Sequence, residues 1–199
     1  GCRVKPGSMG RPSPGWQVEL HDEQGQPVKT QEPGRIAVKL EPRPVGLFQE
    51  YVGDDKINQK AFVNGFYYTG DKAYRDEEGY FWFVGRDDDI IKSSGYRISP
   101  FEVESALLTH PAVKEAAVVG APDPIRGIIV KAYLILKPNI EPSERLAVEI
   151  QNHVKEITAP YKYPRSIEFL DKLPKTHSGK TRRNVLRAMA AGKNPEGKD

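Results

Sequence analysis

Gly65-Phe66-Tyr67-Tyr68-Thr69-Gly70-Asp71 begins the part of the sequence that decides the fold, which continues in Gly85-Arg86-Asp87-Asp88-Asp89-Ile90-Ile91-Lys92 and Gly95-Tyr96-Arg97. Short aromatic runs alternate with turn-forming glycines in these segments, which is typical of antiparallel strands joined by tight turns. The first segment ends in a carboxylate, and the other two each carry an arginine. Carboxylate oxygens can accept both hydroxyls of a ribose, and a guanidinium group can bind a phosphate, so the pattern indicates a nucleotide-handling site.

Composition places limits on the class of protein. With 199 residues the chain can form two small domains, and its 38% hydrophobic and 29% charged residues suit a globular protein in water. A net charge of +3 does not point to a nucleic-acid partner, and no apolar run reaches the about 20 residues that span a membrane. The single cysteine, Cys2, cannot form an internal disulfide, so we expect a reducing compartment. That compartment would be the cytoplasm, or the mitochondrial matrix if the source is a eukaryote.

Residues 1–87 are rich in glycine, proline and aromatic residues. Short runs alternate apolar and polar residues, which is the period of half-buried strands. We expect strands at residues 16–20, 35–40, 65–68 and 80–84. Residues 22–27 and 76–79 have the composition of turns. The sequence therefore predicts a small antiparallel β subdomain.

The pattern changes in residues 88–190, where helical and strand periods alternate. Ser99 and Ser143 each precede a run with helical spacing, at a position where serine can cap a helix. After a short hairpin we expect helices at residues 99–108, 143–157 and 180–190 and strands at 113–119, 130–136 and 166–170. This order predicts a compact α+β C-terminal domain, and the chain as a whole is classed as α+β. The polar tail, residues 191–199, is predicted to be disordered.

The boundary between the two halves is expected near Asp88. No long linker separates them, so any relative motion must concentrate in a few residues, as in a short hinge. The run Asp87-Asp88-Asp89 could supply metal ligands, but its spacing lacks the alternation of an EF-hand loop, and no histidine or cysteine accompanies it. We therefore expect an acidic junction and no metal site.

A second glycine-containing turn, Lys175-Thr176-His177-Ser178-Gly179-Lys180, places a lysine ahead of an arginine-rich segment. An ammonium group on a mobile loop can neutralise charge at a reacting phosphoryl or carboxylate oxygen. A basic segment of this kind is more often a solvated helix face, and nothing in the sequence orients His177 as a base. Lys180 is thus a candidate catalytic residue only in combination with the glycine-rich segments.

In order and spacing these motifs resemble the C-terminal part of the adenylate-forming, AMP-binding superfamily, which includes acyl-CoA synthetases, luciferases and peptide-synthetase adenylation domains. The likeness runs from about Lys5 to Arg187. It is carried by residues 10–15 (GRPSPG), 68–71 (YTGD), 85–86 (GR), 95–104 (GYRISPFEVE) and 173–180 (LPKTHSGK). Residues 94–100 (SGYRISP) and 159–164 (APYKYP) are most similar to medium-chain, benzoate and acetate CoA ligases.

This resemblance implies an ATP-dependent acid–thiol ligase that forms an acyl-AMP and then transfers the acyl group to CoA. Asp71 and Arg86 would bind the ribose of the nucleotide, and Arg97 its phosphate. Lys180 would also contact the nucleotide and would be the catalytic lysine of adenylation. Asp88 would be the hinge about which the C-terminal domain rotates between the two steps.

The resemblance also implies a CoA site and further partners. The pantetheine path would be lined by Ser94, Gly95 and Tyr96. The nucleotide end of CoA would be held by Arg126, Lys155 and Tyr163. The substrates would be a small carboxylic acid, as in fatty acid metabolism, with ATP, Mg²⁺ and CoA. The family's phosphate loop, adenine segment and acyl pocket do not occur in these residues. The missing N-terminal part of the same enzyme would supply them, and we expect the chain alone to be inactive.

Two other functions remain open from the sequence. The chain could be a non-catalytic fragment or module that binds CoA or a partner. It could also belong to an adenylation domain that loads a carrier protein. The cations Arg126 and Lys155 favour free CoA, because the 3′-phosphate of CoA needs neutralising and a carrier-borne pantetheine lacks it.

Overall fold

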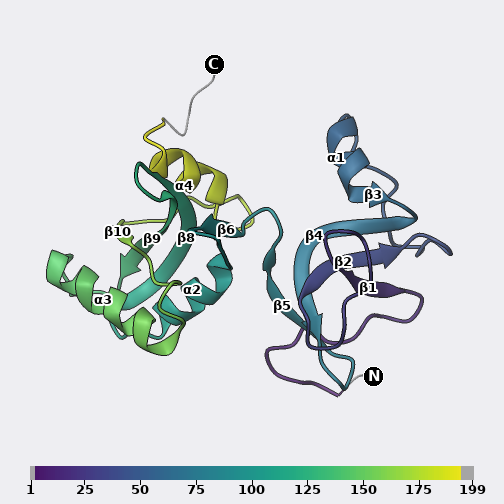
Figure 1. The fold of residues 1–199 in the computed structure, drawn as a ribbon, viewed down its shortest axis with the longest axis horizontal. Coiled ribbons are helices and arrows are strands. Elements are labelled where there is room, and N and C mark those ends of the chain that lie inside the picture. The colour runs from purple at the N-terminus through teal and green to yellow at the C-terminus, as the bar shows by residue number, and fades with distance from the viewer. Residues whose placement is uncertain (1–2, 194–199) are drawn as a thin grey trace. The chain divides into compact units, whose positions relative to one another are not determined.

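The computed structural model describes residues 3–193, which form two compact units that divide after Asp88 (Figure 1). The tail predicted to be disordered, residues 191–199, lies mostly outside the described residues. Within the described part of the chain, no helix is long and apolar enough to cross a membrane.

The first unit is built on a five-stranded sheet in which every neighbouring pair is antiparallel. Its strands are β1 (Val18–His21), β2 (Gly34–Lys39), β3 (Phe62–Val63), β4 (Phe66–Arg75) and β5 (Phe81–Arg86). The order is β1-β2-β4-β3, and β5 also pairs with β4. Leu20, Ile36, Ala73 and Phe81 form a buried cluster on this sheet. The antiparallel β subdomain expected from the alternating runs is therefore present.

Helix α1 (Asp55–Ala61) was not expected from the sequence. It is short and has one buried residue, Ala61, so its sequence carries no apolar stripe. A side-chain cap marks its start, because the Asp54 carboxylate accepts a hydrogen bond from the backbone nitrogen of Ile57 at 3.0 Å.

The second unit is an α+β domain that begins with a two-stranded hairpin. The hairpin is β6 (Ile91–Ser93) and β7 (Tyr96–Ile98). A three-stranded sheet follows, made of β8 (Val113–Asp123), β9 (Gly127–Leu136) and β10 (Ser166–Phe169). Strand β9 is central, antiparallel to β8 and parallel to β10. The helices are α2 (Pro100–Leu108), α3 (Glu144–Ile157) and α4 (Arg183–Ala190). The α+β class expected from the sequence is confirmed.

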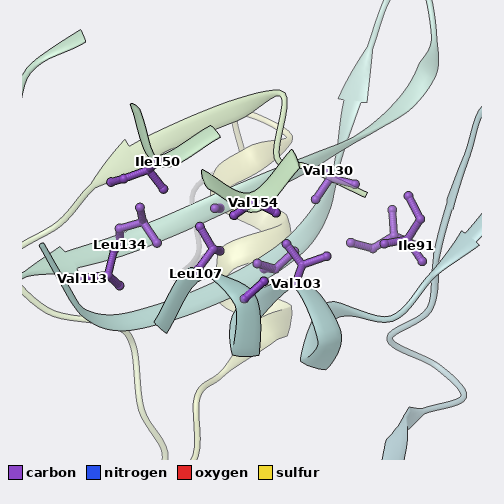
Figure 2. Packing of buried hydrophobic residues seen from close by; sticks show 12 residues of the cluster. Ile91, Val103, Leu107, Val113, Val130, Leu134, Ile150 and Val154 are labelled. Carbon is purple, nitrogen blue, oxygen red and sulfur yellow. The ribbon is translucent and has the colours of Figure 1, made fainter. Parts of the chain in front are cut away.

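Side chains on β8 and β9 alternate between the two faces of this sheet, so each face carries its own core. On one face, α2, α3 and the hairpin close a cluster whose labelled members in Figure 2 are Ile91, Val103, Leu107, Val113, Val130, Leu134, Ile150 and Val154. On the other face, Val119 and Tyr133 pack against Leu186 of α4. The sheet thus lies between α2 and α3 on one side and α4 on the other.

The helix starts test the capping predictions. Ser143 Oγ accepts a hydrogen bond from the backbone nitrogen of Leu146 at 3.1 Å, as expected for a cap. Ser99 occupies the capping position of α2, but its side chain makes no capping hydrogen bond to the helix. The third helix was predicted to begin at Lys180 but begins at Arg183. The reason is that Thr181 pairs with Lys175 in an isolated β-bridge, which keeps the preceding residues in a loop.

Candidate functional site

Asp71 and Arg86 lie opposite each other on neighbouring strands, β4 and β5. Arg86 Nη1 is 3.2 Å from Asp71 Oδ1, and Arg86 Nε donates to Asp88 Oδ1 at 2.9 Å. The strand register therefore brings together the acid and the base that the sequence singled out for the ribose. Both side chains are partly exposed, so a ligand could replace part of this ion pair.

Gly70 allows the close approach of Arg86. It has a φ of +82°, and a Cβ added there would lie 2.8 Å from Arg86 Nη2. Its carbonyl accepts a hydrogen bond from the backbone nitrogen of Asp87 at 2.8 Å, which fixes the strand end beside the turn. Any larger residue would carry both a backbone strain and a steric clash with the guanidinium group.

A cavity of about 570 Å³ opens beside this ion pair in the first unit. Its walls come from α1, β4, the end of β5 and the chain around Tyr51, and they combine aromatic rings with cationic groups. Arg35 adds a second guanidinium group, whose central carbon is 4.5 Å from the centre of the Tyr68 ring. A hollow lined by guanidinium groups and aromatic rings suits a polar, anionic ligand such as a nucleotide.

The three consecutive aspartates at the junction are each paired with a base. Lys72 contacts Asp87 at 2.7 Å, and Arg86 contacts Asp88. Asp89 accepts hydrogen bonds or ion pairs from arginines of α4. Among residues 3–193 no group of three or more His, Cys, Asp or Glu side chains is arranged to hold a metal ion. The acidic run is thus engaged in ion pairs within the protein.

The β6–β7 hairpin carries the predicted pantetheine path on a turn whose backbone is unusual. Ser94 and Gly95 both have positive φ, +49° and +83°, as the tight turns of two-residue hairpins require. Ser93 Oγ donates to the carbonyl of Ile128 at 2.7 Å and so ties the hairpin to β9. Arg97 follows on β7, with an exposed side chain. The turn of the hairpin therefore lies at the surface, while the strands that carry it are fixed to the core.

Tyr96 joins this hairpin to the segment 159–165. Its ring stacks on Tyr161 with centroids 4.0 Å apart and planes 12° apart. Next to it, Lys162 forms an ion pair with Glu102 of α2. Two regions assigned to CoA, the hairpin and the segment that bears Tyr163, are thereby in direct contact.

Lys155 and Tyr163 also meet. Lys155 Nζ, at the end of α3, is 4.2 Å from the centre of the Tyr163 ring. Arg165 Nη1 donates to the Tyr163 hydroxyl at 2.9 Å. Arg165 was not predicted from the sequence, although it is a basic residue only two positions after Tyr163. Two cations thus flank one tyrosine, an arrangement suited to phosphate oxygens.

Arg126 lies on a separate element, the turn between β8 and β9. Its backbone nitrogen donates to Asp123 Oδ1 at 2.8 Å, and the nitrogen of Ile125 donates to the same oxygen at 3.0 Å. This turn fixes the backbone while the Arg126 side chain is exposed. The backbone that carries this cation is therefore fixed by hydrogen bonds, and its side chain is open to solvent.

Lys180 belongs to a loop closed by its own backbone. The nitrogen of Thr176 donates to the carbonyl of Lys180 at 2.7 Å, and the Lys180 nitrogen donates to Thr176 Oγ1 at 3.0 Å. Gly179 supplies the positive φ of the turn, +83°. Both Lys180 and His177 have exposed side chains, and within the described residues neither one forms a side-chain hydrogen bond or ion pair. A fixed backbone with an exposed ammonium group suits a residue that contacts a negatively charged ligand at the surface of the unit.

Residues 102–180 match the model of the AMP-binding enzyme C-terminal domain. This part of the chain is thus similar to that family. The chain is 58% identical over 196 residues to 4-hydroxybutyrate–CoA ligase 1 of Metallosphaera sedula, covering 98% of this chain and 35% of that protein. It is 56% identical over 190 residues to the mitochondrial acyl-coenzyme A synthetase ACSM3 of Rattus norvegicus, covering 94% of this chain and 33% of that protein.

A solved structure gives the same relationship for the fold. The anthranilate CoA ligase AuaEII in complex with anthranoyl-AMP superposes with a TM-score of 0.82 at 42% identity, covering 94% of this chain and 36% of that one. The resemblance to the C-terminal portion of acyl-CoA synthetases is therefore confirmed. The chain spans about a third of the length of these relatives.

One charged group inside the second unit was not predicted from the sequence. Glu104 of α2 is buried, and Arg183 Nη2 donates to both of its carboxylate oxygens, at 2.7 and 2.6 Å. Burial raises the pKa of Glu104, and the neighbouring Arg183 opposes that shift. Glu104 and Arg183 are 79 residues apart in the chain, so no local pattern could reveal the pair.

Proposed function

We propose that this chain is the C-terminal portion of an AMP-forming acyl-CoA synthetase, which activates a carboxylic acid with ATP and transfers the acyl group to CoA. The observation that carries the proposal is the pairing of Asp71 with Arg86 beside the cavity of about 570 Å³. The named functions of the relatives, which are CoA ligases and acyl-coenzyme A synthetases, support it. The remaining N-terminal part of the same enzyme would complete the site.

In the first step, a carboxylate oxygen of the acid attacks the α-phosphorus of ATP and the bond to pyrophosphate breaks. Asp71 would accept the ribose hydroxyls, with Arg86 held beside it. Arg97 would bind the nucleotide phosphate, and the exposed ammonium group of Lys180 would neutralise charge that develops in this step.

In the second step, the CoA thiolate attacks the acyl carbonyl carbon and AMP leaves. The C-terminal domain would rotate about Asp88 so that the hairpin turn, with Ser94, Gly95 and Tyr96, replaces Lys180 beside the adenylate. The exposed positions of the hairpin turn and of the lysine loop on different elements of the same unit are consistent with two such states.

The nucleotide end of CoA would bind Arg126, Lys155 and Tyr163. Arg126 and Lys155 can each contact phosphate oxygens. Lys155 Nζ lies 4.2 Å from the centre of the Tyr163 ring, so these two residues would bind the same part of CoA. Mg²⁺ is expected with ATP in this family, but the aspartates of the junction are engaged by Lys72, Arg86 and the arginines of α4. These residues do not fit a metal site, so we route no step through them.

A second candidate is an adenylation domain that acylates a carrier protein. The same first step would apply, and the acceptor would be pantetheine on a protein. The flanking of Tyr163 by Lys155 and Arg165 favours free CoA, because cations at this place can neutralise the 3′-phosphate, which free CoA carries and a carrier-borne pantetheine lacks. We also expect the enzyme to work in the cytoplasm, or in the mitochondrial matrix of a eukaryote. The rat relative is named as a mitochondrial protein.

The test uses the full-length protein that contains this chain, with ATP, Mg²⁺, CoA and a panel of aliphatic and aromatic carboxylic acids. We expect AMP and pyrophosphate to be released, and an acyl-CoA to form, only when a carboxylic acid is present. All three products are measured by chromatography. Release of ADP and phosphate would contradict the proposal. AMP release without acyl-CoA, but with acylation of a phosphopantetheinyl carrier, would favour the second candidate.

A further inference from the structure

The Glu104–Arg183 ion pair crosses the open edge of the sheet in the second unit. Strand β8 lies at that edge, and Glu104 Oε1 accepts a hydrogen bond from the outward-facing backbone nitrogen of Val118 at 2.8 Å. Glu104 belongs to α2, on one face of the sheet, whereas Arg183 opens α4, on the other. The pair therefore connects the two helical layers around β8.

Asp89 belongs to the same network. Arg183 Nη1 is 3.5 Å from Asp89 Oδ2, and Arg187 Nη1 donates to Asp89 Oδ1 at 2.8 Å. The side chains of Asp89 and Glu104 are only 10% and 11% exposed. One guanidinium group thus contacts two largely buried carboxylates. Lysine cannot reproduce this, because its single ammonium group lacks the planar fork of arginine.

The lysine loop is attached to the domain at its two ends. Before it, Leu173 is buried in the core against α4. At its base, the backbone nitrogen of Arg182 donates to the carbonyl of Pro174 at 2.8 Å. Arg183 is the next residue, so its ion pairs fix the C-terminal end of the loop that carries Lys180.

We propose that Arg183 is a positioning residue for Lys180. Through its ion pairs, Arg183 holds the lysine loop, Glu104 of α2 and Asp89 in one rigid arrangement. The inference rests on the proposed function, in which Lys180 serves adenylation. Asp89 directly follows the proposed hinge residue Asp88. When the chain rotates at the hinge, these charged contacts carry Lys180 with it, and the lysine loop keeps its position relative to Asp89 and α2. The hairpin turn at Gly95 has its own attachment to the core through Ile91 and Ile98, and does not depend on Arg183.

The experiment compares Arg183→Lys with Arg182→Lys in the full-length enzyme. Arg182 precedes Arg183 and has an exposed side chain, so it controls for a conservative change at the start of α4. We expect Arg183→Lys to lower kcat for acyl-AMP formation by about a hundredfold, the scale of a displacement of about 1 Å, with KM for ATP nearly unchanged. Conversion of pre-made acyl-AMP to acyl-CoA should stay within about twofold, and Arg182→Lys should leave both steps unchanged.

A double-mutant cycle tests whether Arg183 acts through the lysine. In a Lys180→Ala background, Arg183→Lys should cause no further loss of adenylation. An equal loss with and without Lys180, or an equal loss in both half-reactions, would overturn the inference and show a general structural role. An unaffected Arg183→Lys enzyme would overturn it as well, while Lys180→Ala still reports on the proposed function by itself.

Glu104→Gln supplies the second variant if Arg183→Lys does not accumulate as folded protein. It keeps the shape of the side chain and an acceptor for Val118, but removes the charge that holds Arg183. The same loss of adenylation alone is expected, and full adenylation activity in folded Glu104→Gln would contradict the inference. If Lys180→Ala itself spares adenylation, the lysine assignment in the proposed function fails, and the inference falls with it.

Discussion

The rings of Tyr96 and Tyr161 stack at a centroid separation of 4.0 Å, and this contact joins the β6–β7 hairpin to the segment that carries Tyr163. The two tyrosines lie 49% and 38% exposed, so the stack is at the surface and open to a ligand. It brings the turn assigned to pantetheine into contact with the segment that carries Tyr163, one of the residues assigned to the nucleotide end of CoA.

Replacing Tyr161 with alanine should weaken CoA binding because the hairpin loses this support. An aromatic pair is worth about 0.5–1.5 kcal/mol, which corresponds to a rise of about twofold to twelvefold in KM for CoA. KM for ATP should not change. Tyr161→Phe, which keeps the stacked ring, is the control and should behave like the unaltered enzyme; a weakened Tyr161→Phe enzyme would show that the hydroxyl matters instead of the stack.

Gly70→Ala should impair nucleotide binding through Arg86. The Cβ would lie 2.8 Å from Arg86 Nη2 and would push the guanidinium group away from Asp71. Gly65 is a matched control, because its φ of +79° is similar and nothing lies within 4 Å of its Cβ. Both changes carry a backbone cost of about 1–2 kcal/mol, seen as similar losses in Tm. Only Gly70→Ala should raise KM for ATP, and equal KM values in the two variants would refute the role of Arg86.

Arg126→Ala and Lys155→Ala should affect CoA and leave ATP unaffected. Loss of one charge-assisted hydrogen bond costs about 1.5–3 kcal/mol, so KM for CoA should rise about tenfold to a hundredfold. Dephospho-CoA lacks the 3′-phosphate but keeps the thiol. If these cations bind that phosphate, the variants should discriminate poorly between the two thiols. Unchanged discrimination would move both residues out of the CoA site and favour the carrier-protein candidate.

His110 should make the stability of the second unit depend on pH. Burial lowers the pKa of His110, His153 of α3 lowers it further and Lys137 adds to this effect, whereas Glu149 opposes the shift. The unfolded chain therefore binds the proton more readily than the folded one. The stability contributed by neutral His110 is present above its ordinary pKa of about 6.5 and is lost as the pH falls through the lowered pKa of the folded state.

The measurement is Tm between pH 8 and pH 5, to be followed for the unaltered enzyme and for His110→Gln. We expect the unaltered enzyme to lose more stability on acidification than His110→Gln. The exposed His177 supplies the control, because His177→Gln should leave the pH profile unchanged. Parallel profiles for the unaltered enzyme and His110→Gln would show that another group titrates.

Local sequence patterns predicted much of the fold and of the site. Glycine and aromatic spacing indicated the hairpins, and the strand register then paired Asp71 with Arg86. The late start of α4 was missed because a β-bridge outside any periodic run holds Thr181. Glu102 and Glu104 both follow closely on the predicted helix start at Ser99, and nothing local distinguishes the two acids. Only tertiary packing buries Glu104 against Arg183 and leaves Glu102 exposed.

The central claim is that Lys180 serves adenylation alone within a two-step acyl-CoA synthetase. The most direct test measures both half-reactions of Lys180→Ala in the full-length enzyme: pyrophosphate release from ATP and acid, and acyl-CoA formation from pre-made acyl-AMP. The account predicts that the first reaction falls by about a hundredfold or more, the scale of one lost electrostatic contact in a transition state, while the second is nearly unchanged. Equal losses in both half-reactions, or an unimpaired first reaction, would contradict it.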